Sequence, residues 1–240
     1  MESLKEIMIQ IADIHRAVWR ASDRPCEAIT TAPVGNPALC AWLPDKGWPL
    51  GQLIEILVDA PGCAELSLLA PAMAALPGNW PIVLLKPPLV PNMAAWQQWQ
   101  IDTRRLWWIE PALLRDAWWS AEQLLRSQSV SALLCWVDPI DERLLRRLHL
   151  GAQSSGTLFV MFRPRHSASL FSPAVLRLEL VFDAALGPVI RLLKSRGPKP
   201  AHVIAVRTQA VANRSSHQTL AKPRNLLNHV VDCNPAPTLS

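Results

Sequence analysis

Residues 53–66 read LIEILVDAPGCAEL, and this segment contains the start of an α/β domain. Residues 53–58 are apolar apart from Glu55, which is typical of a strand buried on both faces. Residues 59–62 then turn the chain, and residues 65–76 are suited to a helix. A strand, a turn and a helix form the first half of a βαβ unit.

The same alternation continues toward the C-terminus. Strand-like apolar runs and helical runs follow one another at residues 82–85, 114–125, 131–137, 141–152 and 157–162. Strands separated by helices pair in parallel, because their connections are crossovers. Two period-2 runs, 175–182 and 189–194, predict a hairpin. We therefore expect an α/β fold: a three-layer domain with a mostly parallel central sheet and a C-terminal antiparallel hairpin.

The chain divides into four predicted parts. They are an N-terminal amphipathic helix (1–22), a Pro/Gly-rich lead-in (23–49), the α/β domain (50–207) and a basic, disordered tail (208–240). The helix carries one apolar stripe, formed by Leu4, Ile7, Ile11, Ile14 and Val18. This stripe either packs on the chain's own domain or binds a partner, and we treat it as a candidate partner-binding element.

Composition excludes several classes of protein. Half of the 240 residues are apolar and 18% are charged, so the chain can bury a sizeable core. No apolar stretch is long enough to span a membrane, and the N-terminus is acidic where a signal peptide is basic, so we expect a cytoplasmic protein without membrane contact. The five cysteines form no CxxC pair and the histidines are scattered, so no disulfide framework and no metal site are expected.

Positive charge is concentrated at the C-terminus. The last 50 residues hold eight basic residues and one acidic residue. Six of the basic residues are candidate partner-binding groups: Arg191, Lys194, Arg196, Lys199, Arg207 and Arg214. A basic segment of this kind suits a polyanion or an acidic protein surface, or else only keeps the chain soluble.

The turn after the first long strand stands where a phosphate-binding loop would lie, but its residues do not suit phosphate. Such a loop needs free backbone N–H groups, a lysine for the phosphates and a hydroxyl for Mg²⁺. The corresponding positions here are Asp59, Pro61, Gly62, Ala64, Glu65 and Leu66. Glu65 stands where the lysine belongs and Leu66 where the hydroxyl belongs. We expect a degenerate site, no bound cofactor and no enzymatic activity.

Two other positions resemble parts of an ATPase site. Asp138 ends an apolar strand as a Walker B aspartate does, and Arg163 stands near a γ-phosphate sensor position. The second strand instead ends in Lys86-Pro87, where a RecA-type ATPase carries a water-activating glutamate. The tryptophans are not interleaved with basic residues along the chain, so they are interpreted as core or interface anchors.

Several stretches together resemble one family. They are WLPDKGWPLG at 42–51, LVDAPGCAEL at 57–66, LCWVD at 134–138, LRRL at 145–148, FRP at 162–164 and LKSRGP at 193–198. The chain resembles ImuA, the RecA-like, SulA-related family of bacterial translesion-synthesis operons. The resemblance implies a RecA-like domain over about residues 30–206 that does not hydrolyse ATP.

The resemblance also implies a function and partners. The family acts in SOS-induced mutagenesis with ImuB, a polymerase-like protein without catalytic residues, and indirectly with a DnaE-type polymerase, while its C-terminal part contacts RecA. We therefore expect a non-catalytic adaptor in DNA damage tolerance that bridges an ImuB-like protein and RecA, with weak or indirect nucleic acid contact. The SulA cell-division inhibitor shares the pattern over about residues 66–165, so a SulA-type inhibitor that binds FtsZ is the alternative.

Overall fold

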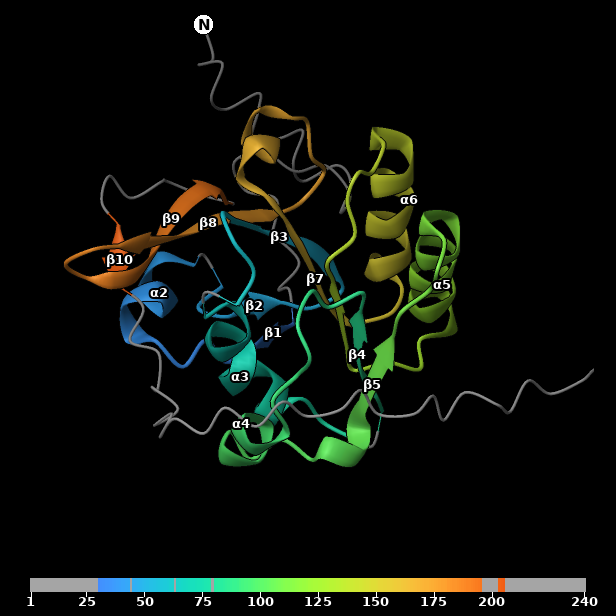
Figure 1. Ribbon diagram of the computed structural model, residues 1–240, viewed down its shortest axis with the longest axis horizontal. Helices are drawn as coiled ribbons and strands as arrows, with labels where there is room; N and C mark the ends of the chain where they lie inside the picture. The colour runs from blue at the N-terminus through green and yellow to red at the C-terminus, as the bar shows by residue number, and fades with distance from the viewer. Residues whose placement is uncertain (1–29, 44, 63, 79, 196–202, 206–240) are drawn as a thin grey trace, which may run out of the picture. The chain divides into compact units, whose positions relative to one another are not determined.

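The computed structural model describes residues 30–43, 45–62, 64–78, 80–195 and 203–205 (Figure 1). The predicted N-terminal helix with its apolar stripe and the predicted tail lie outside these residues. The same holds for four of the basic candidates, Arg196, Lys199, Arg207 and Arg214. Arg191, Lys194 and the six named residues of the predicted phosphate loop are described, whereas Cys63 between them is not.

An eight-stranded sheet forms the centre of the described fold (Figure 1). In chain order its strands are β3 (Gln52–Val58), β4 (Ile82–Leu85), β5 (Leu106–Ile109), β6 (Ala132–Cys135), β7 (Leu158–Pro164), β8 (Leu176–Asp183), β9 (Gly187–Lys194) and β10 (Ile204–Ala205). They lie in the order β10-β9-β8-β3-β7-β6-β4-β5, and every pair from β8 to β5 is parallel. β9 runs antiparallel to both β8 and β10. The predicted α/β fold, with a mostly parallel sheet and an antiparallel hairpin, is confirmed.

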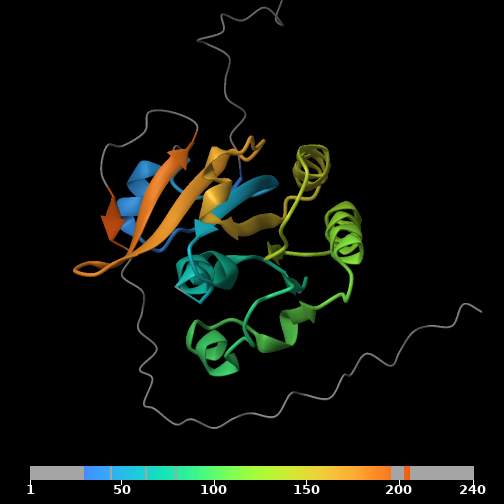
Figure 2. The same cartoon turned by 45° about the horizontal axis from the view of Figure 1, so that its top comes forward.

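Helices cover both faces of this sheet (Figure 2). They are α3 (Glu65–Ala75), α4 (Met93–Gln98), α5 (Leu114–Ser127) and α6 (Glu142–Gln153). Successive side chains of a strand point to opposite faces, so β3 serves two cores. Ile54 and Ile56 pack with α3 and α4, whereas Leu53 packs with α5 and α6.

The lead-in contains structure that hydrophobic periodicity did not indicate. Residues 30–49 form α2 (Pro37–Trp42) and a small antiparallel pair, β1 (Thr31–Ala32) with β2 (Trp48–Pro49). Asn36 caps α2 by accepting a hydrogen bond from Leu39 N, and Pro37 occupies the first turn. The Asn-Pro pair is a helix-start signal, but six residues are too few to show a 3.6-residue period. Two short 3-10 helices complete the described elements, η1 (Thr103–Arg105) and η2 (Arg165–Ser169).

Candidate functional site at the carboxyl edge of the sheet

The turn between β3 and α3 lies at the carboxyl edge of the central strands, where open α/β sheets usually bind their ligands. Two residues of this turn have left-handed backbone conformations, Gly62 with φ +89° and Ala64 with φ +83°. Ala64 is also the N-cap of α3, and its side chain makes no capping hydrogen bond. The backbone N–H groups in the first turn of α3 therefore receive no hydrogen-bond acceptor from the N-cap side chain.

Glu65 instead bonds back to the turn that precedes the helix. Its Oε1 accepts a hydrogen bond from Gly62 N at 2.6 Å, and the residue is only 3% exposed. A carboxylate is favoured there because the helix dipole presents partial positive charge at this end. Its other oxygen, Oε2, is buried and makes no hydrogen bond to the described residues. A phosphate binding at this turn would therefore meet a negative charge that already uses the Gly62 N–H.

The neighbouring groups close the turn further. Leu66 packs against the apolar core, and the hydroxyl of Ser67 donates to Ala64 O at 2.8 Å. Leu89 lies directly over Gly62, since a Cβ atom at Gly62 would come within 2.8 Å of Leu89 Cδ1. The Ser67 hydroxyl is therefore hydrogen-bonded to the backbone, and the apolar Leu89 side chain covers Gly62.

A buried ion network occupies the adjacent part of the sheet. Glu55 is fully buried in β3, and its two carboxylate oxygens accept from Arg163 Nη1 at 3.0 Å and Arg177 Nε at 2.6 Å. Arg177 also donates to three backbone carbonyls of the segment after β7, those of Ser167, Ala168 and Leu170. Glu55 thus links β3 to its two neighbours, β7 and β8. Arg177, which Glu55 binds, holds the segment that follows β7. The only sequence signal for this network is one carboxylate inside an apolar strand.

The two ATPase-like positions are engaged with each other. Arg163 Nε lies 3.3 Å from Asp138 Oδ1, and Arg163 is buried. Lys86 Nζ donates to Pro111 O at 3.1 Å, which directs it toward the loop after β5. Neither cation is directed at the turn before α3.

The charged side chains at the exposed margin of this edge also have partners within the domain. Arg165 binds both Asp59, at 3.3 Å, and Glu179, and these carboxylates hold the pKa of Arg165 above its usual value. Arg191 contacts the second oxygen of Glu179 at 3.4 Å. Lys194 donates to Ser172 O at 2.9 Å, and desolvation lowers its pKa. Both described basic candidates are therefore tied to the domain.

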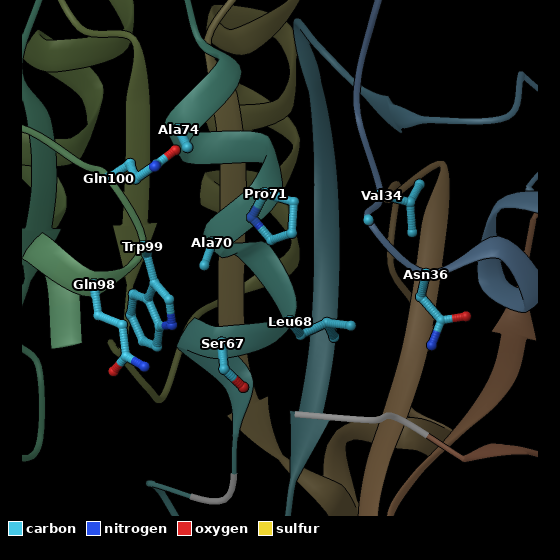
Figure 3. A pocket seen from close by; sticks show the side chains of 11 residues that line it. Val34, Asn36, Ser67, Leu68, Ala70, Pro71, Ala74, Gln98, Trp99 and Gln100 are labelled. Atoms are coloured by element: carbon cyan, nitrogen blue, oxygen red, sulfur yellow. The ribbon is translucent and has the colours of Figure 1, made fainter. Parts of the chain in front are cut away.

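A cavity of about 510 Å³ opens on the outer side of α3, between the start of α2 and the end of α4 (Figure 3). Its polar side chains are Asn36, Ser67, Gln98 and Gln100, and the indole of Trp99 forms one wall. No titratable side chain lines it. The cavity therefore offers amide and hydroxyl hydrogen bonds, and its lining residues include no acid or base that could activate the Ser67 hydroxyl.

The described residues contain no cluster of three or more His, Cys, Asp or Glu side chains that could hold a metal ion. Within the same residues, none of the helices is long and apolar enough to cross a membrane.

Comparisons with known proteins find likenesses among solved structures but none in the other two searches. No family model matches the chain, and no curated protein matches it. Among solved structures it is similar to SulA from Pseudomonas aeruginosa, with 16% identity and a TM-score of 0.37. The likeness covers 46% of this chain and 97% of that protein, and it does not assign the chain to a family.

Proposed function

We propose that this protein is a non-catalytic adaptor of an SOS-induced translesion DNA synthesis complex, built on a RecA-like domain with a degenerate nucleotide site. In this proposal it bridges an ImuB-like, polymerase-related protein and RecA. The observation that carries the non-catalytic part is the Glu65 carboxylate on Gly62 N–H, at the place where a triphosphate would have to bind.

The charge arrangement supports the same proposal. A carboxylate facing a triphosphate is repulsive, by about 1–4 kcal/mol at surface-like dielectric constants. Two nearby cations that would offset this repulsion have other partners: Arg163 pairs with Glu55 and Asp138, and Lys86 with a carbonyl. The translesion-synthesis pathway and the two partners in this proposal are inferred from the resemblance of the sequence to ImuA.

Two titrations test the proposal. Calorimetric injection of Mg·ATP into the full-length protein should give no binding heat, and a micromolar dissociation constant would contradict the degenerate site. Injection of a purified ImuB-like protein should give saturable binding. Absence of that binding would contradict the adaptor role even if ATP does not bind.

A further inference from the structure

The outer surface of α5 and α6 gathers exposed arginine and apolar side chains that lie far apart in the sequence. The two helices lie side by side on one face of the sheet (Figures 1 and 2). We call the group the outer strip and define it by Trp119, Arg143, Arg146, Arg147, Leu150 and Phe171. Trp119 is 64% exposed, Leu150 63% and Phe171 55%.

Side-chain contacts and helix geometry join these residues across three segments. Arg147 of α6 binds Glu122 of α5 at 2.7 Å, which brings the outer sides of the two helices together. Arg146 lies over the ring of Phe171, 5.2 Å from its centroid. On α6, residues 143, 147 and 150 fall on one side, opposite the buried Leu145 and Leu148.

The apolar members of the strip contribute little to the core. The sheet face beneath α5 and α6 is already filled by residues such as Ala121, Leu125 and Leu148, all fully buried. Trp119 and Leu150 leave most of their surface in water instead. Tryptophan and arginine are the residue types that most often carry binding energy at protein interfaces.

The charges of the strip indicate the chemistry of its partner. Arg143 makes no ion pair with the described residues. Arg146 pairs with the exposed Glu142, whereas Glu122 is 13% exposed and is covered by Arg147 and Arg126. The outer strip therefore carries three arginines, and the exposed carboxylates beside it, Asp116 and Glu142, are paired with Arg115 and Arg146.

We propose that the outer strip is the docking surface for a partner segment that carries apolar side chains between carboxylates. The inference rests on the proposed adaptor function, in which the ImuB-like protein is the partner of the folded domain. The aliphatic Leu150 offers no flat ring for a base to stack on, which favours a protein segment over single-stranded nucleic acid. Arg143, which makes no ion pair with the described residues, favours carboxylates on that segment.

The test measures the affinity of the full-length protein for a purified ImuB-like protein. Trp119→Ala and Arg143→Glu should each weaken binding about tenfold or more, as expected for interface anchor residues. Matched controls at the opposite side of α5 are Trp107→Ala, which removes a 53% exposed tryptophan, and Arg104→Glu, which reverses an arginine with an 89% exposed side chain. Both controls should bind as the wild type does, and all four variants should keep its melting temperature.

The outcomes separate the two proposals. If the wild type binds and all four variants bind equally well, the outer strip is not the docking surface, although the adaptor function stands. If the wild type does not bind, the adaptor function fails and this inference fails with it. A labelled thirty-nucleotide oligo-dT is the second probe. Loss of its binding in Trp119→Ala and Arg143→Glu, with binding of the ImuB-like protein unchanged, would overturn the proposal in favour of a nucleic acid surface.

Discussion

At the scale of single residues, Glu55 is the centre of a buried ion network. Its carboxylate is fully buried and compensates two buried arginines, Arg163 and Arg177. Removing one partner of a buried ion pair leaves the other charges without compensation, which costs about 3–5 kcal/mol. Glu55→Ala should therefore lower the free energy of unfolding by that amount in urea titrations.

An exposed ion pair provides the control for this prediction. Asp102 and Arg104 pair at 2.9 Å with exposed side chains, and surface pairs contribute little. Arg104→Ala should leave the urea midpoint almost unchanged, because it removes this pair while Asp102 still caps η1. Equal effects of the two substitutions would mean that the Glu55 network does not stabilise the sheet.

Glu65 and Leu66 allow a test of the proposed degenerate nucleotide site at the same scale. The double variant Glu65→Lys, Leu66→Thr restores the two side-chain types that a phosphate loop requires. We expect it to show no ATP turnover in a coupled assay, because Pro87 offers no carboxylate to orient water and Lys86 binds a carbonyl. Rapid hydrolysis by this variant would show that a catalytic base lies elsewhere on the chain.

The described residues also show what could be predicted from the sequence at this scale. Glu65 and Gly62 are three positions apart, so their contact is local and a turn-plus-helix pattern points to it. The partners of Glu55 lie 108 and 122 positions away. Such pairs are set by strand order, which periodicity does not specify, so Arg177 and the role of Arg163 in the network were not predictable.

At the scale of elements, α3 is unusual because Pro71 lies inside it and the helix continues. Pro71 faces Gly35, at the start of α2, beside the cavity of Figure 3. Gly35 has φ +73°, and a Cβ atom there would lie 2.4 Å from Pro71 Cγ. The glycine is therefore required both by its backbone conformation and by the close approach of the proline.

Gly35→Ala should therefore destabilise the protein by more than backbone strain alone. Gly156 is the matched control, since it has φ +63° and no atom lies within 4 Å of its ideal Cβ position. Gly156→Ala should cost only the strain of a left-handed residue, about 1–2 kcal/mol. Gly35→Ala should cost about 1–3 kcal/mol more, because of overpacking. Equal losses in thermal unfolding would show that α2 and α3 separate freely.

Element lengths explain which parts of the fold the sequence indicated. β3, β4, β6 and β7 are continuous buried runs, and α5 and α6 are long enough to show a helical period. α2 and α4 have six residues each, and β5 has four, including two adjacent tryptophans. These short elements were missed because their positions depend on packing against the sheet rather than on a repeated pattern.

At the scale of the whole molecule, the basic C-terminal segment is the main feature outside the described fold. Residues 208–240 lie beyond the α/β domain and carry Arg214, Lys222 and Arg224. Deleting residues 208–240 should leave the melting temperature unchanged and should weaken RecA association at low salt. If the shortened protein binds RecA as tightly as the full chain does at both low and high salt, the segment acts only as a solubiliser.

The two basic candidates inside the described fold already have partners within the domain. Arg191 and Lys194 bind Glu179 and Ser172 O within the domain. They are less free to contact a partner than their sequence positions indicate. Substituting them should therefore affect the β8–β9 hairpin as well as any interface.

The adaptor proposal is tested most directly by sedimentation of a three-component mixture. Purified ImuB-like protein and RecA should sediment separately when mixed, and should move together only when this protein is added. Buffer without nucleotide should suffice, since the proposed bridge needs no ATP bound to this chain. If the two partners do not move together in its presence, or do so equally well in its absence, the protein is not a bridge between them.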